Sequence, residues 1–177
     1  KKGSYAEDYR VKNEVGKTLF LKLINYSHLN RNQIDDNGHV IEIEIAKRLN
    51  HHNLCKYVDS GSIMINGGQC SYIATEYVSS ETLSQKIIRD RELSVYEIKV
   101  IAKSVLSALQ YLHSQTIPVI HNEVTMQNVL FNLVGGFEDL KLIDFGHARL
   151  LNQSPAKPNL NELNVFCLAP ERLSGIS

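Results

Sequence analysis

Short runs of alternating hydrophobic and polar residues dominate the first 78 positions. In the clearest run, Leu19, Leu21 and Leu23 occupy every second position, which is the period of a strand. Turns at Gly16 and at residues 66–68 join the runs in pairs. The strands predicted from these patterns are residues 4–13, 17–25, 54–65 and 70–78. Because a tight turn joins each pair, we predict two hairpins and an antiparallel sheet.

Residues 40–50, VIEIEIAKRLN, fit two kinds of element. Their first half alternates with period two, as a strand does, whereas Glu42, Ala46 and Leu49 share one face of a helix. We predict a helix for this stretch.

The second predicted helix begins after Ser94. Ser94 and Glu97 have the spacing of a capping box, and the helix is expected to end near His113, before Pro118. Its apolar residues recur every three or four positions over four turns, which predicts a helix packed on the core. They are Ile98, Ile101, Val105, Leu109 and Leu112.

The composition is that of an ordinary globular domain with one well-buried core. The chain has 177 residues, of which 43% are hydrophobic and 21% charged. Its 19 basic and 19 acidic residues balance, so we expect no nucleic-acid partner and no attraction to an anionic membrane. With no apolar run long enough for a membrane span or signal peptide, we predict a cytoplasmic protein. The three cysteines are predicted to be reduced thiols.

Polar side chains with metal and proton chemistry gather between Val119 and Gly146. His121, Glu123 and Asn128 fall within eight residues, and Asp144 directly follows the apolar end of a predicted hairpin, VLFNLVGGFEDLKLI. A carboxylate and a carboxamide brought together by such a hairpin can hold Mg²⁺ against the phosphates of a nucleotide. We therefore place the candidate chemistry in this stretch.

Lys22 is a second candidate, because it interrupts the apolar strand LFLKLI. A buried ammonium needs a carboxylate or a phosphate as partner. The alternative is a lysine on an edge strand that faces water.

The stretch HNEVTMQN, followed by Asp144, Phe145 and Gly146, resembles the protein kinase catalytic loop H-R-D-x-x-x-x-N and its D-F-G motif. His121 and Asn128 match the pattern, whereas Asn122 and Glu123 replace the family's Arg and Asp. Further motifs in the family's order are a lysine strand around Lys22, a partial Gly-rich loop at Gly3, a hinge-like CSYIATEYV and the triplet Ala169, Pro170, Glu171.

The resemblance implies an α+β, two-lobe protein kinase-like fold. Residues 1–78 would form an N-lobe with an antiparallel sheet and helix C, and residues 79–177 an incomplete, mainly helical C-lobe. Because the chain stops after the A-P-E triplet, we expect a truncated C-lobe with an exposed apolar face that self-associates.

The resemblance also implies a role for each candidate residue. ATP and Mg²⁺ are the implied cofactors, and a protein substrate or regulatory partner is implied as well. Glu123 would take the hydroxyl proton, Lys22 would contact phosphates, and Glu42 rather than Glu44 would pair with Lys22. Asn128 and Asp144 would hold Mg²⁺, while Gly3, Glu76, Val78 and Leu130 would contact the nucleotide and Thr75 would control the back of its pocket.

Several positions depart from the family's pattern. Asp8 and Phe20 stand where the family usually has the Val and Ala that contact adenine, which predicts weak nucleotide binding. Glu123 is one methylene longer than Asp, a displacement of about 1 Å that can cost about a hundredfold in rate. Thr125 and Asn164 replace the Lys and Thr usual in Ser/Thr kinases.

Three functions are therefore weighed. The first is an ATP- and Mg²⁺-dependent protein kinase of the Ser/Thr type with reduced activity. The second is a pseudokinase that acts as a nucleotide-binding or scaffolding module. The third is a small-molecule kinase of the same fold, which ranks last because such relatives generally lack D-F-G and A-P-E.

Overall fold

The computed structural model describes residues 6–132 and 136–153 of the chain. The chain divides into two compact units, one made of Lys1–Asn50 with Cys55–Val78 and the other of His51–Leu54 with Ser79–Ser177.

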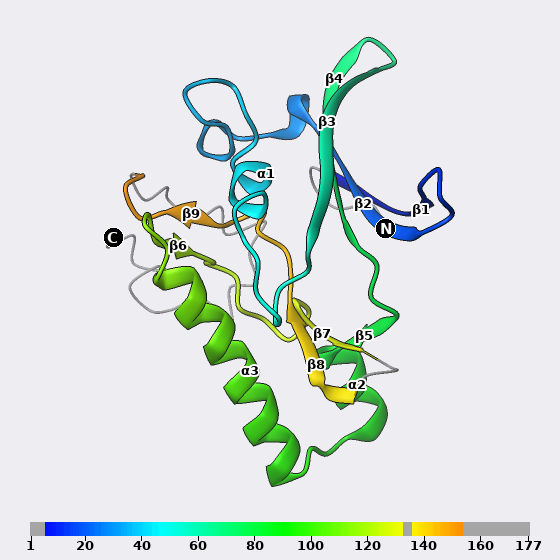
Figure 1. Cartoon of the computed structure of the whole chain (residues 1–177), viewed down its shortest axis with the longest axis vertical. Coiled ribbons are helices and arrows are strands. Elements are labelled where there is room, and N and C mark those ends of the chain that lie inside the picture. Colours follow the sequence, from blue (N-terminus) through cyan, green and yellow to red (C-terminus); the bar gives the residue numbers. More distant parts are fainter. Residues whose placement is uncertain (1–5, 133–135, 154–177) are drawn as a thin grey trace. The chain divides into compact units, whose positions relative to one another are not determined.

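The first unit contains a four-stranded antiparallel sheet (Figure 1). Its strands are β1 (Ala6–Lys12), β2 (Thr18–Asn25), β3 (Tyr57–Ile65) and β4 (Gly68–Glu76), in the order β1-β2-β4-β3. The turns that join them contain Gly16 at φ +79° and Gly67 at φ +80°, a backbone region that favours glycine. Both predicted hairpins are therefore confirmed, with β3 beginning three residues later than expected.

Helix α1 (Ile41–Ala46) packs on one face of this sheet. The helical prediction for residues 40–50 is confirmed, but the helix is short because Val40 is extended and a turn begins at Lys47. Two 3₁₀ turns, Tyr26–His28 and Arg31–Gln33, connect it to β2. The core under the sheet consists of Ala6, Ile24, Val40, Ile43, Ala46 and Ile73.

The second unit is mixed α and β. Two helices, α2 (Leu83–Asp90) and α3 (Val95–His113), accompany a three-stranded sheet and a separate strand pair. The sheet has the order β5-β7-β8, and the pair is β6 with β9. The bounds are β5 Ser80–Thr82, β6 Val119–Ile120, β7 Val129–Asn132, β8 Gly136–Leu142 and β9 Arg149–Leu150.

Helix α3 begins where the sequence predicts. Ser94 accepts a hydrogen bond from the backbone N–H of Glu97, and the Glu97 side chain accepts one from the backbone of Ser94, which completes the capping box. Its burial differs from the prediction, because Leu112 is fully buried whereas Ile98 is exposed. The helix contacts β8, and its buried residues, Ala108 and Leu112, lie in its carboxyl-terminal half, so it is only partly a core helix. Within the described ranges, no helix has the length and hydropathy needed to cross a membrane.

Within the second unit, hydrogen bonds of Asn53 hold the segment His51–Leu54 against β8. Asn53, which is buried, donates from Nδ2 to the carbonyl oxygen of Leu140 at 2.9 Å and accepts from the N–H of Leu142 at 2.8 Å. Leu54 forms a parallel bridge with Leu142, so its expected place at the start of the 54–65 strand is wrong.

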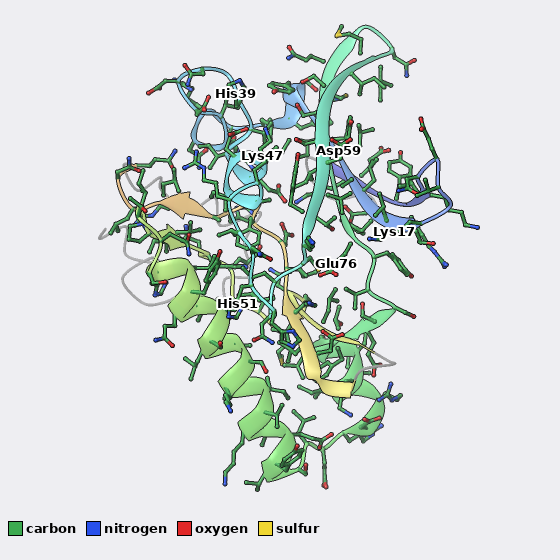
Figure 2. The ribbon with its side chains drawn as sticks, viewed as in Figure 1. Lys17, His39, Lys47, His51, Asp59 and Glu76 are labelled. Carbon is green, nitrogen blue, oxygen red and sulfur yellow. The ribbon has the colours of Figure 1, made fainter. Side chains whose placement is uncertain are left out.

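A ring contact holds the same segment against α3. The imidazole of His51 stacks on Tyr111 with ring centroids 4.9 Å apart, and its Nε2 lies 3.3 Å from the hydroxyl of Ser107. Figure 2 labels His51 in the loop that precedes β3. Four residues of the chain are therefore fixed to α3 and β8 by packing and by hydrogen bonds.

Replacing Leu112 with Ala should lower the free energy of unfolding by about 2–5 kcal/mol, because it empties a fully buried site. Leu106→Ala, on the same helix, should change it by no more than about 0.5 kcal/mol, since Leu106 is 63% exposed. Urea denaturation measures both. Equal losses would show that the face containing Leu106 is covered in solution.

Candidate functional site

The ammonium of Lys22 and the carboxylate of Glu42 form a buried ion pair. Nζ lies 2.7 Å from Oε1 and 3.0 Å from Oε2, and the side chains are 11% and 9% exposed. Lys22 lies on β2, which is an interior strand, so the alternative of an edge lysine facing water is wrong. Glu44 pairs instead with Lys47 at 2.7 Å near the surface. The pair predicted by the resemblance is therefore present.

Three other residues singled out from the sequence lie on the same sheet face as Lys22. The register places Asp8 directly opposite Lys22 and Phe20 directly opposite Thr75. Cross-strand partners face the same side, and Phe20 is two residues from Lys22, so all of these side chains share a face. Asp8, Phe20 and Thr75 are half-buried there.

The hinge-like residues lie where β4 ends. Glu76 is the last residue of the strand, its N–H donates to the carbonyl of Lys56 at 2.9 Å, and its Oε1 accepts from the N–H of Lys56. Val78 lies beyond the strand and is half-buried. Gly3 and the A-P-E triplet lie outside the described residues.

In the second unit, His121 connects the two loops of the candidate site. Its imidazole is 1% exposed, Nδ1 accepts from the N–H of Glu123 at 3.3 Å, and Nε2 donates to the carbonyl of Ile143 at 3.2 Å. This tautomer is assigned from the partners. The centroid of the His121 ring also lies 5.2 Å from the centroid of the Phe145 ring. His121 therefore fixes the backbone on both sides of the site.

Burial lowers the pKa of His121 below its ordinary 6.5, although the nearby negative charge of Asp144 partly opposes the shift. The imidazole is consequently neutral at physiological pH, as its acceptor Nδ1 requires.

Asn128 and Asp144 are brought together by the backbone. The N–H of Ile143 donates to the carbonyl of Asn128 at 2.9 Å, which places Asp144 one residue from that bond. The amide Nδ2 of Asn128 donates to the carbonyl of Glu123 at 2.9 Å, and Asp144 Oδ1 accepts from the N–H of Gly146 at 3.0 Å. Both orientations are fixed by these bonds.

The donor set fits Mg²⁺. A carboxamide oxygen and a carboxylate are hard oxygen ligands, and Mg²⁺ usually takes one or two protein ligands and completes its shell with phosphate and water. Among the described residues, no three His, Cys, Asp or Glu gather into a metal site of their own. Two ligands from Asn128 and Asp144 match a metal that is shared with phosphates.

The structure adds His147, which the sequence did not reveal. Its Nε2 lies 4.0 Å from Oε2 of Glu123, and its carbonyl accepts from Nδ2 of Asn122 at 2.9 Å. The pairing of β6 with β9 brings these loops together. Because each of these strands has only two residues, no periodicity could have predicted the contact.

The candidate residues are therefore distributed over both units. Lys22, Glu42, Glu76 and Val78 belong to the first unit, and Glu123, Asn128, Leu130 and Asp144 to the second. Leu130 lies on β7, paired with Thr82 and Lys141, and is half-buried.

Comparison with known proteins gives one consistent family. A family model described as "Protein kinase domain" matches residues 2–176. A probable serine/threonine-protein kinase nek3 of Dictyostelium discoideum is 30% identical over 175 residues, which is 96% of this chain and 15% of that protein. Calcium-dependent protein kinase 6 of Plasmodium berghei is 28% identical over 96% of this chain and 11% of its own length.

A human protein, serine/threonine-protein kinase WNK4, is 31% identical over 116 residues, or 66% of this chain and 9% of that protein. The chain thus spans 15% or less of the length of these relatives.

Removing one member of the buried pair should destabilise the protein. Lys22→Met or Glu42→Gln should each lower the free energy of unfolding by about 3–5 kcal/mol, because a buried charge loses its partner. The double variant should recover part of that loss. Lys47→Met and Glu44→Gln are matched controls, since this more exposed pair contributes about 0.2–1 kcal/mol. A double-mutant cycle by urea denaturation measures both couplings, and similar values would contradict the burial argument.

The free energy of unfolding should decrease as the pH is lowered, because of His121. Its folded pKa lies below 6.5, so the unfolded chain binds more protons in acid. The stabilisation is complete above about pH 6.5 and is lost progressively below it, as the unfolded imidazole becomes protonated.

His121→Gln should flatten this slope between about pH 6.5 and pH 5, whereas His113→Gln, at an exposed position, should leave it unchanged. His51, whose pKa is also lowered by burial, is retained in both variants. Thermal melting over this range tests the prediction, and parallel curves for wild type and His121→Gln would refute it.

Proposed function

The chain belongs to the protein kinase domain family, and on this premise we propose that it transfers the γ-phosphate of ATP to a protein hydroxyl of the Ser/Thr type. The observation that carries the proposal is the buried pair of Lys22 and Glu42 together with the backbone bond that sets Asp144 beside Asn128. The relatives described as serine/threonine-protein kinases support the choice of hydroxyl.

In the first unit, Lys22 contacts the phosphates of ATP. Glu42 accepts hydrogen bonds from Nζ at both carboxylate oxygens, so the ammonium is held in one orientation rather than sampling its many rotamers. The fixed orientation of the Lys22 ammonium is the main contribution that a positioned lysine makes to phosphoryl transfer.

The nucleotide is contacted, as the resemblance implies, by Gly3, by the backbone of Glu76 to Val78, and by Thr75.

In the second unit, Asn128 and Asp144 hold Mg²⁺, and Leu130 contacts the nucleotide. When bound, Mg²⁺ supplies positive charge that neutralises the phosphates. The hydrogen bonds from Asn128 to the carbonyl of Glu123 and from Gly146 to Asp144 orient both side chains, because each is held by a backbone group.

Glu123 takes the proton of the attacking hydroxyl. Its N–H and carbonyl are both engaged, by His121 and Asn128, so its backbone is fixed and only its side chain can adjust. The extra methylene relative to Asp displaces the carboxylate by about 1 Å, which lowers the rate. The proposed activity is therefore slow.

A second candidate, nucleotide binding without turnover, is favoured by Thr125. This residue is 7% exposed and stands where Ser/Thr kinases usually have a Lys that stabilises the transferring phosphoryl group. A buried neutral hydroxyl supplies no such charge. On this reading the domain is a pseudokinase that binds nucleotide and a regulatory protein partner.

Phosphate transfer from ATP to a generic protein substrate in the presence of Mg²⁺ distinguishes the two. The wild-type protein should transfer phosphate slowly. Glu123→Asp should raise the rate by up to about a hundredfold, because the shorter side chain returns the carboxylate to the family's usual position. Glu123→Gln should reduce the rate to background, because the amide cannot accept the proton. Glu92→Gln is the control, since Glu92 is an exposed carboxylate between α2 and α3.

No transfer by wild type or by Glu123→Asp, with a melting temperature raised by MgATP, would establish the second candidate. No phosphate transfer and no change in melting temperature on addition of MgATP would contradict both candidate functions.

A further inference from the structure

The four-stranded sheet of the first unit has two edges that differ in charge. In the order β1-β2-β4-β3, the edge strands are β1 and β3 (Figure 1). Four of the seven residues of β1, AEDYRVK, are charged, and charged side chains commonly protect an edge against pairing with another chain. The nine residues of β3, YVDSGSIMI, contain one charged residue, Asp59, and no Pro. The β3 edge therefore lacks the protection that the β1 edge has.

The half of β3 next to the hairpin turn is apolar, exposed and regular. Ile63, Met64 and Ile65 are 48%, 65% and 37% exposed. The irregularity of the β3–β4 pairing lies between Tyr57 and Asp59, so no bulge twists the edge over residues 60–65. In the described part of the chain, the only strand that pairs with β3 is β4. A long, regular and apolar edge of this kind is a template for a further strand.

We propose that two copies of the chain associate through β3, with the two strands antiparallel and related by a two-fold axis. An antiparallel pair centred on Ser62 overlaps residues 59–65 and sets Ser60 opposite Met64. The backbone groups that β3 directs away from β4 then pair with those of the second copy. The two four-stranded sheets are thereby joined into one.

The distribution of charge favours a second copy as the partner. Residues 60–69 contain no charged side chain, so two identical edges approach without repulsion between like charges. In the register centred on Ser62, Asp59 lies opposite Ile65, which leaves the two Asp59 residues at opposite ends of the pair, about 20 Å apart. Each Asp59 accepts a hydrogen bond from the hydroxyl of Tyr72 in its own sheet at 2.9 Å. A charged partner strand would gain no ion pair over residues 60–69, whereas an uncharged copy loses none.

The experiment measures the dissociation constant of the dimer by analytical ultracentrifugation over about 1–200 µM protein. Ser62 is exposed, and Ser62→Lys and Ser62→Glu should each raise the constant at least about fivefold, because identical charges then face each other at the axis. An equimolar mixture of these two variants should restore association, since opposite charges then face each other.

Val15→Lys is the matched control. Val15 is 85% exposed in the turn between β1 and β2, so this variant adds the same charge to the same unit away from β3 and should leave the constant unchanged. Melting temperatures show that each variant is folded. Should a variant at position 62 not fold, Met64→Lys, at an exposed position opposite Ser60 in the proposed pair, takes its place and should weaken the dimer.

A wild-type chain that stays monomeric over the whole range would overturn the inference. A dimer that Leu106→Lys on α3 weakens, and that the variants of β3 leave unchanged, would overturn it too. So would a mixture of Ser62→Lys and Ser62→Glu that associates no better than either variant alone, because the two-fold pair requires residue 62 to face its own copy. Each of these outcomes leaves the proposed function intact, since none involves the nucleotide.

Discussion

The first unit depends on the ion pair between Lys22 and Glu42. An ammonium under a sheet is costly in isolation, and the carboxylate compensates that cost only because both of its oxygens lie within hydrogen-bonding distance. Since Lys22 is fixed in the register of β2 and Glu42 belongs to α1, the pair also fixes which face of the helix is turned to the sheet. The apolar residues Ile43 and Ala46 are then directed into the core with Ile24.

In the second unit, the buried polar side chain is His121, and its hydrogen-bond partners are backbone groups. His121 is buried and neutral, and it holds the loop before β7 and the loop after β8 through one acceptor and one donor nitrogen. The bond from Ile143 to Asn128 extends the β7–β8 pairing by one step beyond the strands. The candidate residues Glu123 and Asn128 therefore project from backbone segments that hydrogen bonds hold in place, which favours a preorganised site.

Local signals predicted much of this arrangement. The two hairpins of the first unit follow from alternation and turn residues, and the start of α3 follows from its capping box, because each depends on neighbours in sequence. The bridge of Leu54 to Leu142 and the contact of His147 with Glu123 depend on segments far apart in the chain. The apolar period of α3 showed which face is hydrophobic, but not that Ile98 would be left exposed, since burial also requires a partner.

Asp144 has a φ of +69°, in a region of backbone space that Asp and Asn enter far more readily than other side chains. Its Oδ1 supports that shape by accepting from Gly146 two residues on. The carboxylate proposed as a metal ligand therefore also supports the turn that presents it. Exchanging it for alanine would remove the proposed metal ligand together with the side chain that stabilises the local conformation, whereas asparagine would preserve the turn and remove only the charge.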